Sequence, residues 1–392
     1  MDVMNEFIER AGFALSLHSP WLFRNIIRPE LYRRETDPED VHEAALEMAD
    51  RYASVIAAHR ECFDFPDLRI TIKGKSFIPF GTAAGMDKNG DAIVPFSNVF
   101  GFLEPGTVTF LDRRGNDKPR VAIDDGNRDF YNVQGFPSKG LMYFLDRVDR
   151  YKSHPLSNNV PLYVNICGVP PTNMDRDEAL DRAWDETDAM ILHLVNSVDG
   201  FVWNPFSPNT ETLKMLRTPR AFERYAKLFK LNADKKLRLV KMGPYDAHQR
   251  GEWLSLVGAW LDGGGDGIVA VNTYATPRNE VPVESWGYPT AGRSGKFLSD
   301  YRLRAVNDTR REFPQSVIFA TGGIFDADDA YNTFYKGADA VEGYTPFAYE
   351  GLGLSRKLMK GVSKLMRRDG YQTLEDLRQD VRGEAQDYFC LR

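Results

Sequence analysis

The sequence predicts an α/β protein, a (β/α)8 barrel preceded by a small N-terminal helical extension. From residue 70 onward, eight short apolar runs rich in Val, Ile and Phe alternate with helical segments. This alternation is typical of parallel strands that are buried on both faces. A doubly wound sheet is the main alternative, but it needs a glycine-rich phosphate loop after its first strand. Gly81-Thr82-Ala83-Ala84-Gly85 does not have the GxGxxG pattern, so the barrel is favoured.

The composition is typical of a soluble globular enzyme. The chain has 392 residues, of which 42% are hydrophobic and 27% charged, so it can bury a large core. The net charge of −6 is spread along the chain and gives no reason to expect a nucleic-acid partner. There is no run of 18 or more apolar residues, and the N-terminus lacks the pattern of a signal peptide. We therefore expect neither a membrane span nor a cleaved leader.

The cysteines and histidines argue against a metal site. Cys62, Cys167 and Cys390 lie far apart without CxxC spacing, which fits a reducing compartment better than a disulfide framework. The six histidines form no HxH or HExxH pattern. We therefore expect no catalytic metal.

The first segment, residues 1–65, is predicted to be a helical extension to a barrel that spans residues 66–392. Residues 5 to about 34 form two short helices broken near Ser19-Pro20, rich in Phe, Trp, Leu and Ile and interleaved with arginines. Such a pair can simply dock on the barrel, or it can lie in a membrane interface or cap an apolar tunnel, and the second reading is favoured. A further helix is predicted from the cap at Asp37 and Pro38 to about Ala58.

The eight predicted strands follow in order along the rest of the chain. They are Phe77–Ala83, Phe102–Val108, Leu162–Ile166, Phe201–Asn204, Leu237–Met242, Gly267–Asn272, Val317–Ala320 and Ala340–Tyr344. The segment from about 109 to 160 is long for one strand-to-helix step. We expect it to carry a large loop or extra small strands over the barrel mouth.

Polar side chains follow nearly every predicted strand, and the active sites of such barrels lie at the carboxyl ends of the strands. In chain order these residues are Lys88, Thr107, Asn165, Asn204 with Ser207 and Asn209, Lys241, Asn272 with Thr273, Thr321-Gly322-Gly323, and Tyr344 with Thr345. Around Asn204 the stretch Asn204-Pro205-Phe206-Ser207-Pro208-Asn209-Thr210 is equally compatible with an ordinary Asx or Ser turn. Because polar residues also follow the other predicted strands, we favour a binding or active site over an ordinary turn.

Together these residues suit a phosphate-bearing cofactor with a planar polar head and an anionic substrate. Glycine amides after the last two strands commonly hold a phosphate in such barrels. Flavin mononucleotide fits this set, because Lys241 can stabilise negative charge on the reduced ring and amides can bind its edge.

At this point the residues match a known family. The chain resembles the dihydroorotate dehydrogenases, specifically the class 2, quinone-linked, membrane-associated branch, from about Arg28 to Gly370. The matching motifs are Asp37-Pro38-Glu39-Asp40-Val41-His42, Ala83-Ala84-Gly85-Met86-Asp87-Lys88-Asn89-Gly90, Gly106-Thr107-Val108-Thr109, Gly115-Asn116-Asp117-Lys118-Pro119-Arg120, Asn132-Val133-Gln134-Gly135-Phe136, Ser207-Pro208-Asn209-Thr210, Ser294-Gly295-Lys296 and Thr321-Gly322-Gly323-Ile324. Ser207 indicates class 2, because class 1 enzymes carry Cys before the Pro.

The resemblance implies a role for each site residue. Ser207 would be the base for the C5 proton of dihydroorotate, and Lys88 a second catalytic residue, while C6 delivers hydride to FMN. The substrate would be held by Lys88, Asn132, Gly135, Phe136, Asn204, Asn209, Asn272 and Thr273. FMN would be held by Ala84, Gly85, Lys88, Thr107, Asn165, Asn204, Lys241, Gly295, Gly323, Tyr344 and Thr345. A quinone entering between the N-terminal helices would accept the electrons. The oxidation of dihydroorotate to orotate is a step in pyrimidine synthesis.

The chain departs from the family pattern at several positions near the site. Val133 and Pro137 follow Asn132 and Phe136 where the family has Arg and Asn, Phe206 precedes Ser207 where the family has Ser, and Ile123 replaces an Arg near the quinone end. The chain also differs from the family pattern at Gly168-Val169-Pro170 and at Val271. Two alternatives therefore stay open. One is a flavin-binding relative that has lost this catalysis, and the other is an FMN oxidoreductase acting on another pyrimidine or enone. The expected location is the cytoplasmic face of a bacterial inner membrane, as a peripheral protein.

Overall fold

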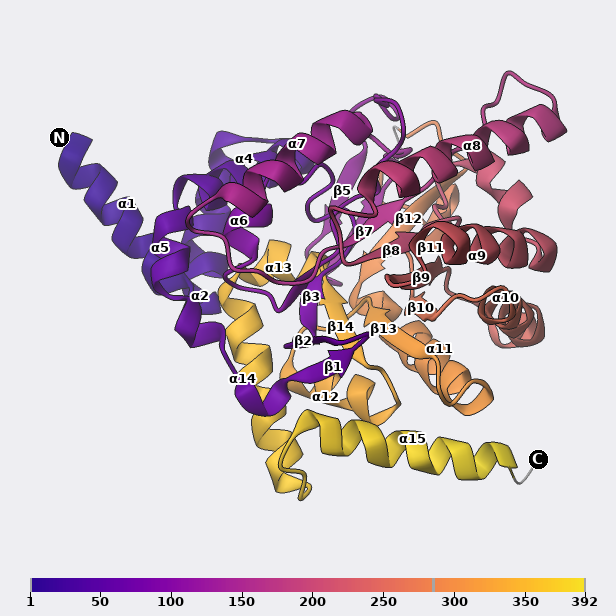
Figure 1. The fold of residues 1–392 in the computed structure, drawn as a ribbon. Coiled ribbons are helices and arrows are strands. Elements are labelled where there is room, and N and C mark those ends of the chain that lie inside the picture. Colours follow the sequence, from indigo (N-terminus) through magenta and orange to yellow (C-terminus); the bar gives the residue numbers. More distant parts are fainter. Residues whose placement is uncertain (1, 284–285, 391–392) are drawn as a thin grey trace.

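A barrel of parallel strands forms the centre of the molecule, as the sequence predicted (Figure 1). The computed structural model describes the backbone of residues 2–283 and 286–390 and the side chains of residues 9–283 and 286–387. The barrel strands are β3 (Phe80–Thr82), β4 (Phe102–Leu103), β7 (Tyr163–Ile166), β8 (Gly200–Trp203), β9 (Leu237–Met242), β10 (Gly267–Ala270), β13 (Val317–Thr321) and β14 (Ala340–Gly343). Hydrogen bonds join them in the order β4-β3-β14-β13-β10-β9-β8-β7, and the bridge between Leu103 and Leu162 closes the ring.

Helices surround the barrel and bury the outward-facing side chains of its strands. They are α6 (Ile93–Phe96), α7 (Gly140–Ser153), α8 (Arg176–Leu194), α9 (Pro219–Ala233), α10 (Arg250–Asp262), α11 (Ser299–Glu312), α12 (Ala327–Tyr335), α13 (Thr345–Glu350) and α14 (Gly353–Arg368). A further helix, α15 (Leu374–Cys390), packs against α11 and α12 along the lower edge of the view in Figure 1. The strands are buried along nearly their whole length. This explains why they read as continuous apolar runs rather than alternating ones.

The packing of β8 against its neighbouring helices explains why Asn204 points into the barrel. Trp203, the last residue of β8, stacks on Tyr225 of α9 with ring centroids 4.3 Å apart and on Trp260 of α10 at 5.8 Å. Successive side chains of a strand point to opposite faces. Because Trp203 points outward to the helices, Asn204 points into the barrel, where it is 4% exposed.

The predicted start of the first barrel strand is wrong by three residues. Phe77 lies in β2 (Lys75–Phe77), which pairs antiparallel with β1 (Ile70–Ile72), and β3 begins only at Phe80. Pro79 separates the two strands, and proline cannot donate a ladder hydrogen bond. The ring of Phe77 packs against Phe102 and Tyr163 inside the barrel, so the hairpin is anchored to the core.

A second sheet of four antiparallel strands lies outside the barrel sheet, beside the mouth. Its strands are β5 (Val121–Asp124), β6 (Asp129–Asn132), β11 (Tyr274–Pro277) and β12 (Thr290–Gly295), in the order β11-β12-β6-β5. The first two lie between residues 109 and 160, where the sequence predicted either a large loop or extra small strands. The pairing of β6 with β12 joins Asn132 to Gly292. This sheet therefore brings Asn132 over the ends of the barrel strands.

The N-terminal helices lie together on one side of the barrel (Figure 1). They are α1 (Asp2–Ser16), α2 (Pro20–Leu22), the π-helical turn η1 (Phe23–Ile27), α3 (Arg28–Arg34), α4 (Pro38–Arg51) and α5 (Ala53–Ala58). The break at Ser19-Pro20 lies where the sequence predicted it, and Asp37 caps α4 by accepting a hydrogen bond from the Glu39 amide. Phe7 and Ile8 lie outside the residues whose side chains are described.

Candidate active site

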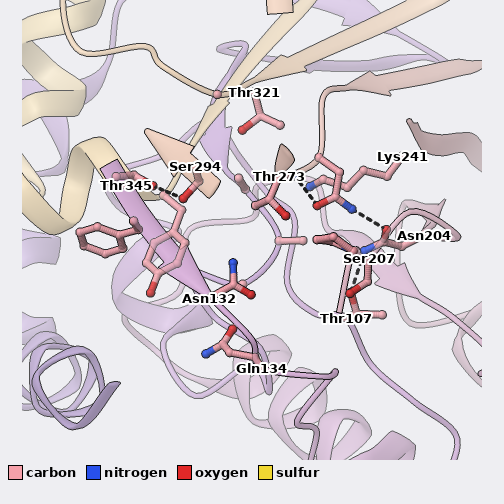
Figure 2. Close-up of a pocket in the computed structure, with 18 of the residues that line it drawn as sticks. Thr107, Asn132, Gln134, Asn204, Ser207, Lys241, Thr273, Ser294, Thr321 and Thr345 are labelled. Carbon is pink, nitrogen blue, oxygen red and sulfur yellow. Dashed lines mark hydrogen bonds between the residues drawn. The ribbon is translucent and has the colours of Figure 1, made fainter. Parts of the chain in front are cut away.

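A deep pocket opens at the carboxyl ends of the barrel strands, between the barrel and the four-stranded sheet (Figure 2). It is lined by residues that lie at or after the carboxyl ends of seven of the eight strands, and by Val121, Phe130, Asn132, Gln134, Gly135, Phe136, Ser294 and Gly295 from the covering sheet and its loops. All of the substrate and cofactor residues that the sequence predicted line this pocket, except Asn165. Asn165 lies directly behind the wall, fully buried.

A row of carboxamides crosses the pocket. Asn209 Nδ2 donates to Asn132 Oδ1 at 2.7 Å, and Asn272 Nδ2 donates to Asn204 Oδ1 at 2.9 Å. Asn204 Nδ2 in turn donates to Thr107 Oγ1 at 3.0 Å. The Asn209 Oδ1 atom is buried and has no hydrogen-bond partner among the described residues. An acceptor left unpaired in this way is suited to an N–H donor on a ligand.

Ser207 lies in the pocket at 8% exposure, and Arg217 holds the loop that carries it. The Arg217 guanidinium donates from Nε to Pro205 O at 2.9 Å and from Nη2 to Ser207 O at 3.0 Å. It also lies 4.8 Å from the ring centroid of Phe206, which packs against Phe222 of α9. Phe206 therefore points away from the pocket and does not displace Ser207 from it.

Lys88 reaches the pocket from the loop after β3 and is fixed by a buried carboxylate. Its Nζ atom is 3.4 Å from Glu39 Oε1 of α4, and the same carboxylate accepts from Arg120 Nε at 2.7 Å. Burial raises the pKa of Glu39, but hydrogen bonds from Arg120 and the charge of Lys88 outweigh it and leave the pKa below its ordinary value. Burial lowers the pKa of Lys88, while Glu39 acts in the opposite direction. A cation held in this way can bind an anionic substrate group.

The floor of the pocket contains two glutamates, Glu104 and Glu342, that the sequence analysis missed, beside the predicted Lys241. Lys241 Nζ donates to Glu104 Oε1 at 2.9 Å, and Asn165 Nδ2 donates to the same oxygen at 2.7 Å. Glu342 of β14 also lines the floor. Both glutamates lie at strand ends: Glu104 is three residues before Thr107 and Glu342 is two residues before Tyr344, both of which the sequence analysis selected. Their position at the carboxyl ends of the strands was the signal that could have identified them.

The residues present fit a flavin mononucleotide. Gly295, Gly322 and Gly323 have φ values of 110°, 103° and 72°, which favour glycine. A Cβ atom on Gly323 would lie 2.4 Å from Ser299 Oγ and 2.9 Å from the Ser299 amide nitrogen, so a side chain does not fit there. The hydroxyls of Ser294 and Thr345 lie 3.0 Å apart at the same end of the pocket. Glycine amides and hydroxyls suit a phosphate, while Lys241 and the carboxamides suit the polar edge of the ring.

A separate apolar cavity lies between the N-terminal helices and the barrel. Its walls include Phe13, Leu17, Phe23, Arg28, Leu31, Tyr32, Val41, His42, Met86, Phe96, Phe347 and Leu352. Phe130 and Tyr344 line both this cavity and the deep pocket, so the two spaces share a wall. Burial, reinforced by the charge of Lys88, lowers the pKa of His42 to about 3, which makes its imidazole neutral beside the Tyr344 ring.

The departures from the family pattern lie mostly outside the pocket. Val133 is 1% exposed and packs with Tyr131 and Trp286 in a small apolar cluster of the covering sheet. Ile123 packs beside Phe130 in another such cluster. Pro137 and Val271 do line the pocket.

Neither a metal centre nor a membrane span is found in the described part of the chain. No group of three or more His, Cys, Asp or Glu side chains there is placed to hold a metal ion. No helix there is long and apolar enough to cross a bilayer. Among the described cysteines, Cys62 and Cys167 are free thiols, and the side chain of Cys390 lies outside the described residues.

Comparisons with known proteins agree on one family. The family model described as dihydroorotate dehydrogenase matches residues 67–366. A protein of Deinococcus deserti named dihydroorotate dehydrogenase (quinone) is 32% identical over 91% of this chain and 98% of its own length. The protein of the same name from Halobacterium salinarum is 32% identical over 86% of this chain and 95% of its own length.

Solved structures show the same likeness in three dimensions. The crystal structure of DHODH from Eimeria tenella in complex with ferulenol matches with a TM-score of 0.75 and 26% identity, over 87% of this chain and 94% of that chain. The ligand-free form from the same organism matches with a TM-score of 0.72 and 27% identity, over 84% of this chain and 98% of that chain.

Proposed function

The chain belongs to the dihydroorotate dehydrogenase family, and on that premise we propose that it oxidises dihydroorotate to orotate with FMN and a quinone. The reaction removes a proton from C5 and a hydride from C6, which leaves a double bond between the two carbons. When bound, FMN supplies the acceptor for the hydride and later passes both electrons to the quinone, which becomes the quinol.

The row of carboxamides carries this proposal. The dihydroorotate ring presents N–H donors and carbonyl acceptors along its edge, and each asparagine side chain offers one group of each kind. The hydrogen bonds among Asn132, Asn209, Asn204 and Asn272 fix these amides before any ligand binds, and Asn209 Oδ1 remains without a partner. Lys88, which lines the same pocket, is the proposed partner of the substrate carboxylate.

Ser207 is the proposed base. A serine hydroxyl is a weak base, so its proton must pass onward through neighbouring groups. Thr210, three residues further along the same loop, has a buried Oγ1 atom with no hydrogen-bond partner among the described residues. This hydroxyl, alone or with a water molecule, is the proposed next member of the path.

The test is an absorbance spectrum of the purified protein, recorded again without oxygen after dihydroorotate is added. A flavin band that is bleached by dihydroorotate supports the cofactor, the substrate and a working base together. Ser207→Ala should retain the flavin and lose most of the bleaching rate at neutral pH, while Ser255→Ala, an exposed serine of α10, should match the wild type. A bound flavin that dihydroorotate cannot bleach would instead favour a relative with lost or altered catalysis.

The apolar cavity between the N-terminal helices and the barrel is the proposed quinone site, and the outer face of these helices the proposed membrane contact. Trp21 and Ile26 are 56% and 55% exposed on this extension, beside Arg24. Apolar side chains interleaved with arginines suit an interfacial position on an anionic membrane. The proposed location is the cytoplasmic face of a bacterial inner membrane.

Vesicle binding tests this contact. Trp21→Glu combined with Ile26→Glu should release the protein from anionic phospholipid vesicles and lower turnover with a long-chain quinone more than with a soluble dye. Leu231→Glu places the same charge on α9, at a side chain that is 80% exposed, and should change neither. An equal loss with both electron acceptors would argue against a quinone entrance on this side.

A further inference from the structure

Two carboxyl groups and one ammonium are buried together at the floor of the deep pocket. Glu104 follows β4, Lys241 lies in β9 and Glu342 lies in β14, with exposures of 0%, 4% and 2%. Lys241 and Glu342 face the pocket directly, and Glu104 lies behind Lys241. Glu342 has no role in the proposed proton path or in the binding of the substrate.

Three carboxylate oxygens of this group lack a hydrogen-bond partner among the described residues. Glu104 Oε1 accepts from both Lys241 and Asn165, but Glu104 Oε2 and both oxygens of Glu342 have no partner among the described residues. Buried carboxylate oxygens without donors are costly. A single proton shared between Glu104 Oε2 and one oxygen of Glu342 satisfies two of these three oxygens and leaves the other Glu342 oxygen unpaired in the described part of the chain.

Charge balance leads to the same conclusion. If both glutamates were ionised, one ammonium would leave a net charge of −1 in the barrel interior, and like charges in one buried site disfavour double ionisation. Glu104 and Lys241 are the charged groups that act on Glu342 in the described structure. Burial, and then the charge of Glu104, raise the pKa of Glu342 well above its ordinary value, and Lys241 opposes them only in part.

We propose that Glu342 is a neutral acid sharing one proton with Glu104, and that this pair sets the reduction potential of the flavin bound above it. The inference rests on the proposed function only in placing FMN in this pocket. With the proton in place, the floor carries no net charge. When Glu342 ionises, its negative charge opposes the negative charge that builds up on the reduced ring, so the potential falls. Glu342 is therefore a positioning residue for charge, and it adds no chemical step.

The first test compares the midpoint potential of the bound flavin in the wild type and in Glu342→Gln as a function of pH. Glutamine keeps the size of the side chain and cannot ionise, so it imitates the protonated acid. The two potentials should agree at low pH, and that of the wild type should fall below that of the variant as pH rises. A tenfold shift of the equilibrium toward oxidised flavin corresponds to about 30 mV for a two-electron couple. A difference that does not change with pH, over the range in which both proteins hold flavin, would overturn the proposal.

A second test needs no flavin and no activity. The infrared carbonyl band of a protonated carboxyl group, assigned with 13C-labelled glutamate, should be present in the flavin-free wild type at pH 7. The band should be absent in Glu342→Gln and retained in Glu186→Gln. Glu186 is the matched control because it is a half-buried glutamate of α8 with a pKa that is also raised by burial. A wild type without a Glu342 band at pH 7 would refute the shared proton even if the variant did not fold. A protein that shows the band but binds no FMN would refute the proposed function instead.

Discussion

Arg217 offers the sharpest test of how the fold positions Ser207. Its guanidinium makes two hydrogen bonds to the carbonyl groups on either side of Phe206 and stacks on the Phe206 ring. Burial lowers the pKa of Arg217 to about 10, so it stays charged at neutral pH. Arg217→Lys keeps the charge but cannot reach both carbonyls with one nitrogen. The loss is one charge-assisted hydrogen bond of about 1.5–3 kcal/mol and a cation–π contact of about 0.5–1 kcal/mol.

A loop freed by about 2–4 kcal/mol no longer holds Ser207 in one place. Misplacement of a reacting group by 1 Å costs about 100-fold in rate, so we expect the anaerobic bleaching rate of Arg217→Lys to fall by about 10- to 100-fold. Flavin content should be unchanged, because Arg217 does not line the pocket. Arg220→Lys, at an exposed position three residues on, is the matched control. If Arg217→Lys bleaches as fast as the wild type, Arg217 stabilises the loop without positioning the base.

Three further substitutions test buried charges. Glu39→Gln should raise the KM for dihydroorotate and lower the free energy of unfolding measured in urea by about 3–5 kcal/mol, because the buried Arg120 and the partly buried Lys88 lose their carboxylate partner. Burial raises the pKa of Asp87 to about 6, so its ionisation opposes folding. Between pH 4 and 7, the free energy of unfolding of the wild type should therefore fall by about 2–3 kcal/mol relative to that of Asp87→Asn. Parallel curves of unfolding free energy against pH for the two proteins would contradict this. Burial raises the pKa of Asp339, but three arginines lower it to about 2, so its stabilising effect holds above pH 4 and is lost as pH falls toward 2. Asp339→Asn should lower the free energy of unfolding by about 3–5 kcal/mol at pH 7. The bleaching rate of the folded protein should not change, because Asp339 precedes β14 at the end of the barrel away from the pocket.

The fold and the membership of the site were predictable because a barrel brings the carboxyl ends of its strands to one edge. Residues at the carboxyl end of each strand then lie near the mouth whatever the rest of the chain does, so Asn204, Lys241 and Asn272 could be grouped without knowledge of any contact. The exact start of β3 was less predictable. Phe77 has the character of a buried strand residue, and only its antiparallel pairing with Ile70 assigns it to a separate hairpin.

Contacts between segments far apart in the chain could not be predicted in the same way. The pairing of β6 with β12 joins residues about 160 positions apart, and it places Asn132 within reach of Asn209. The Lys88–Glu39 pair likewise depends on where α4 docks on the barrel. Glu342 was missed because a single acid in an apolar run gives no indication of its neighbours. Its significance comes from Glu104, which lies 238 positions earlier in the chain.

The departures from the family pattern acquire a different meaning once their side chains are placed. Phe206, which stands directly before Ser207 where the family has Ser, packs against Phe222 and beneath Arg217, so its bulk holds the loop that carries Ser207. Val133 fills an apolar cluster of the covering sheet, where a charged side chain would be buried without a partner. Most of the departures therefore change how the cover of the pocket is held, whereas Pro137 and Val271 change the lining of the pocket itself. Differences from other members of the family should therefore appear first in ligand affinity and in the stability of the covering sheet, and only later in the reaction that the pocket supports.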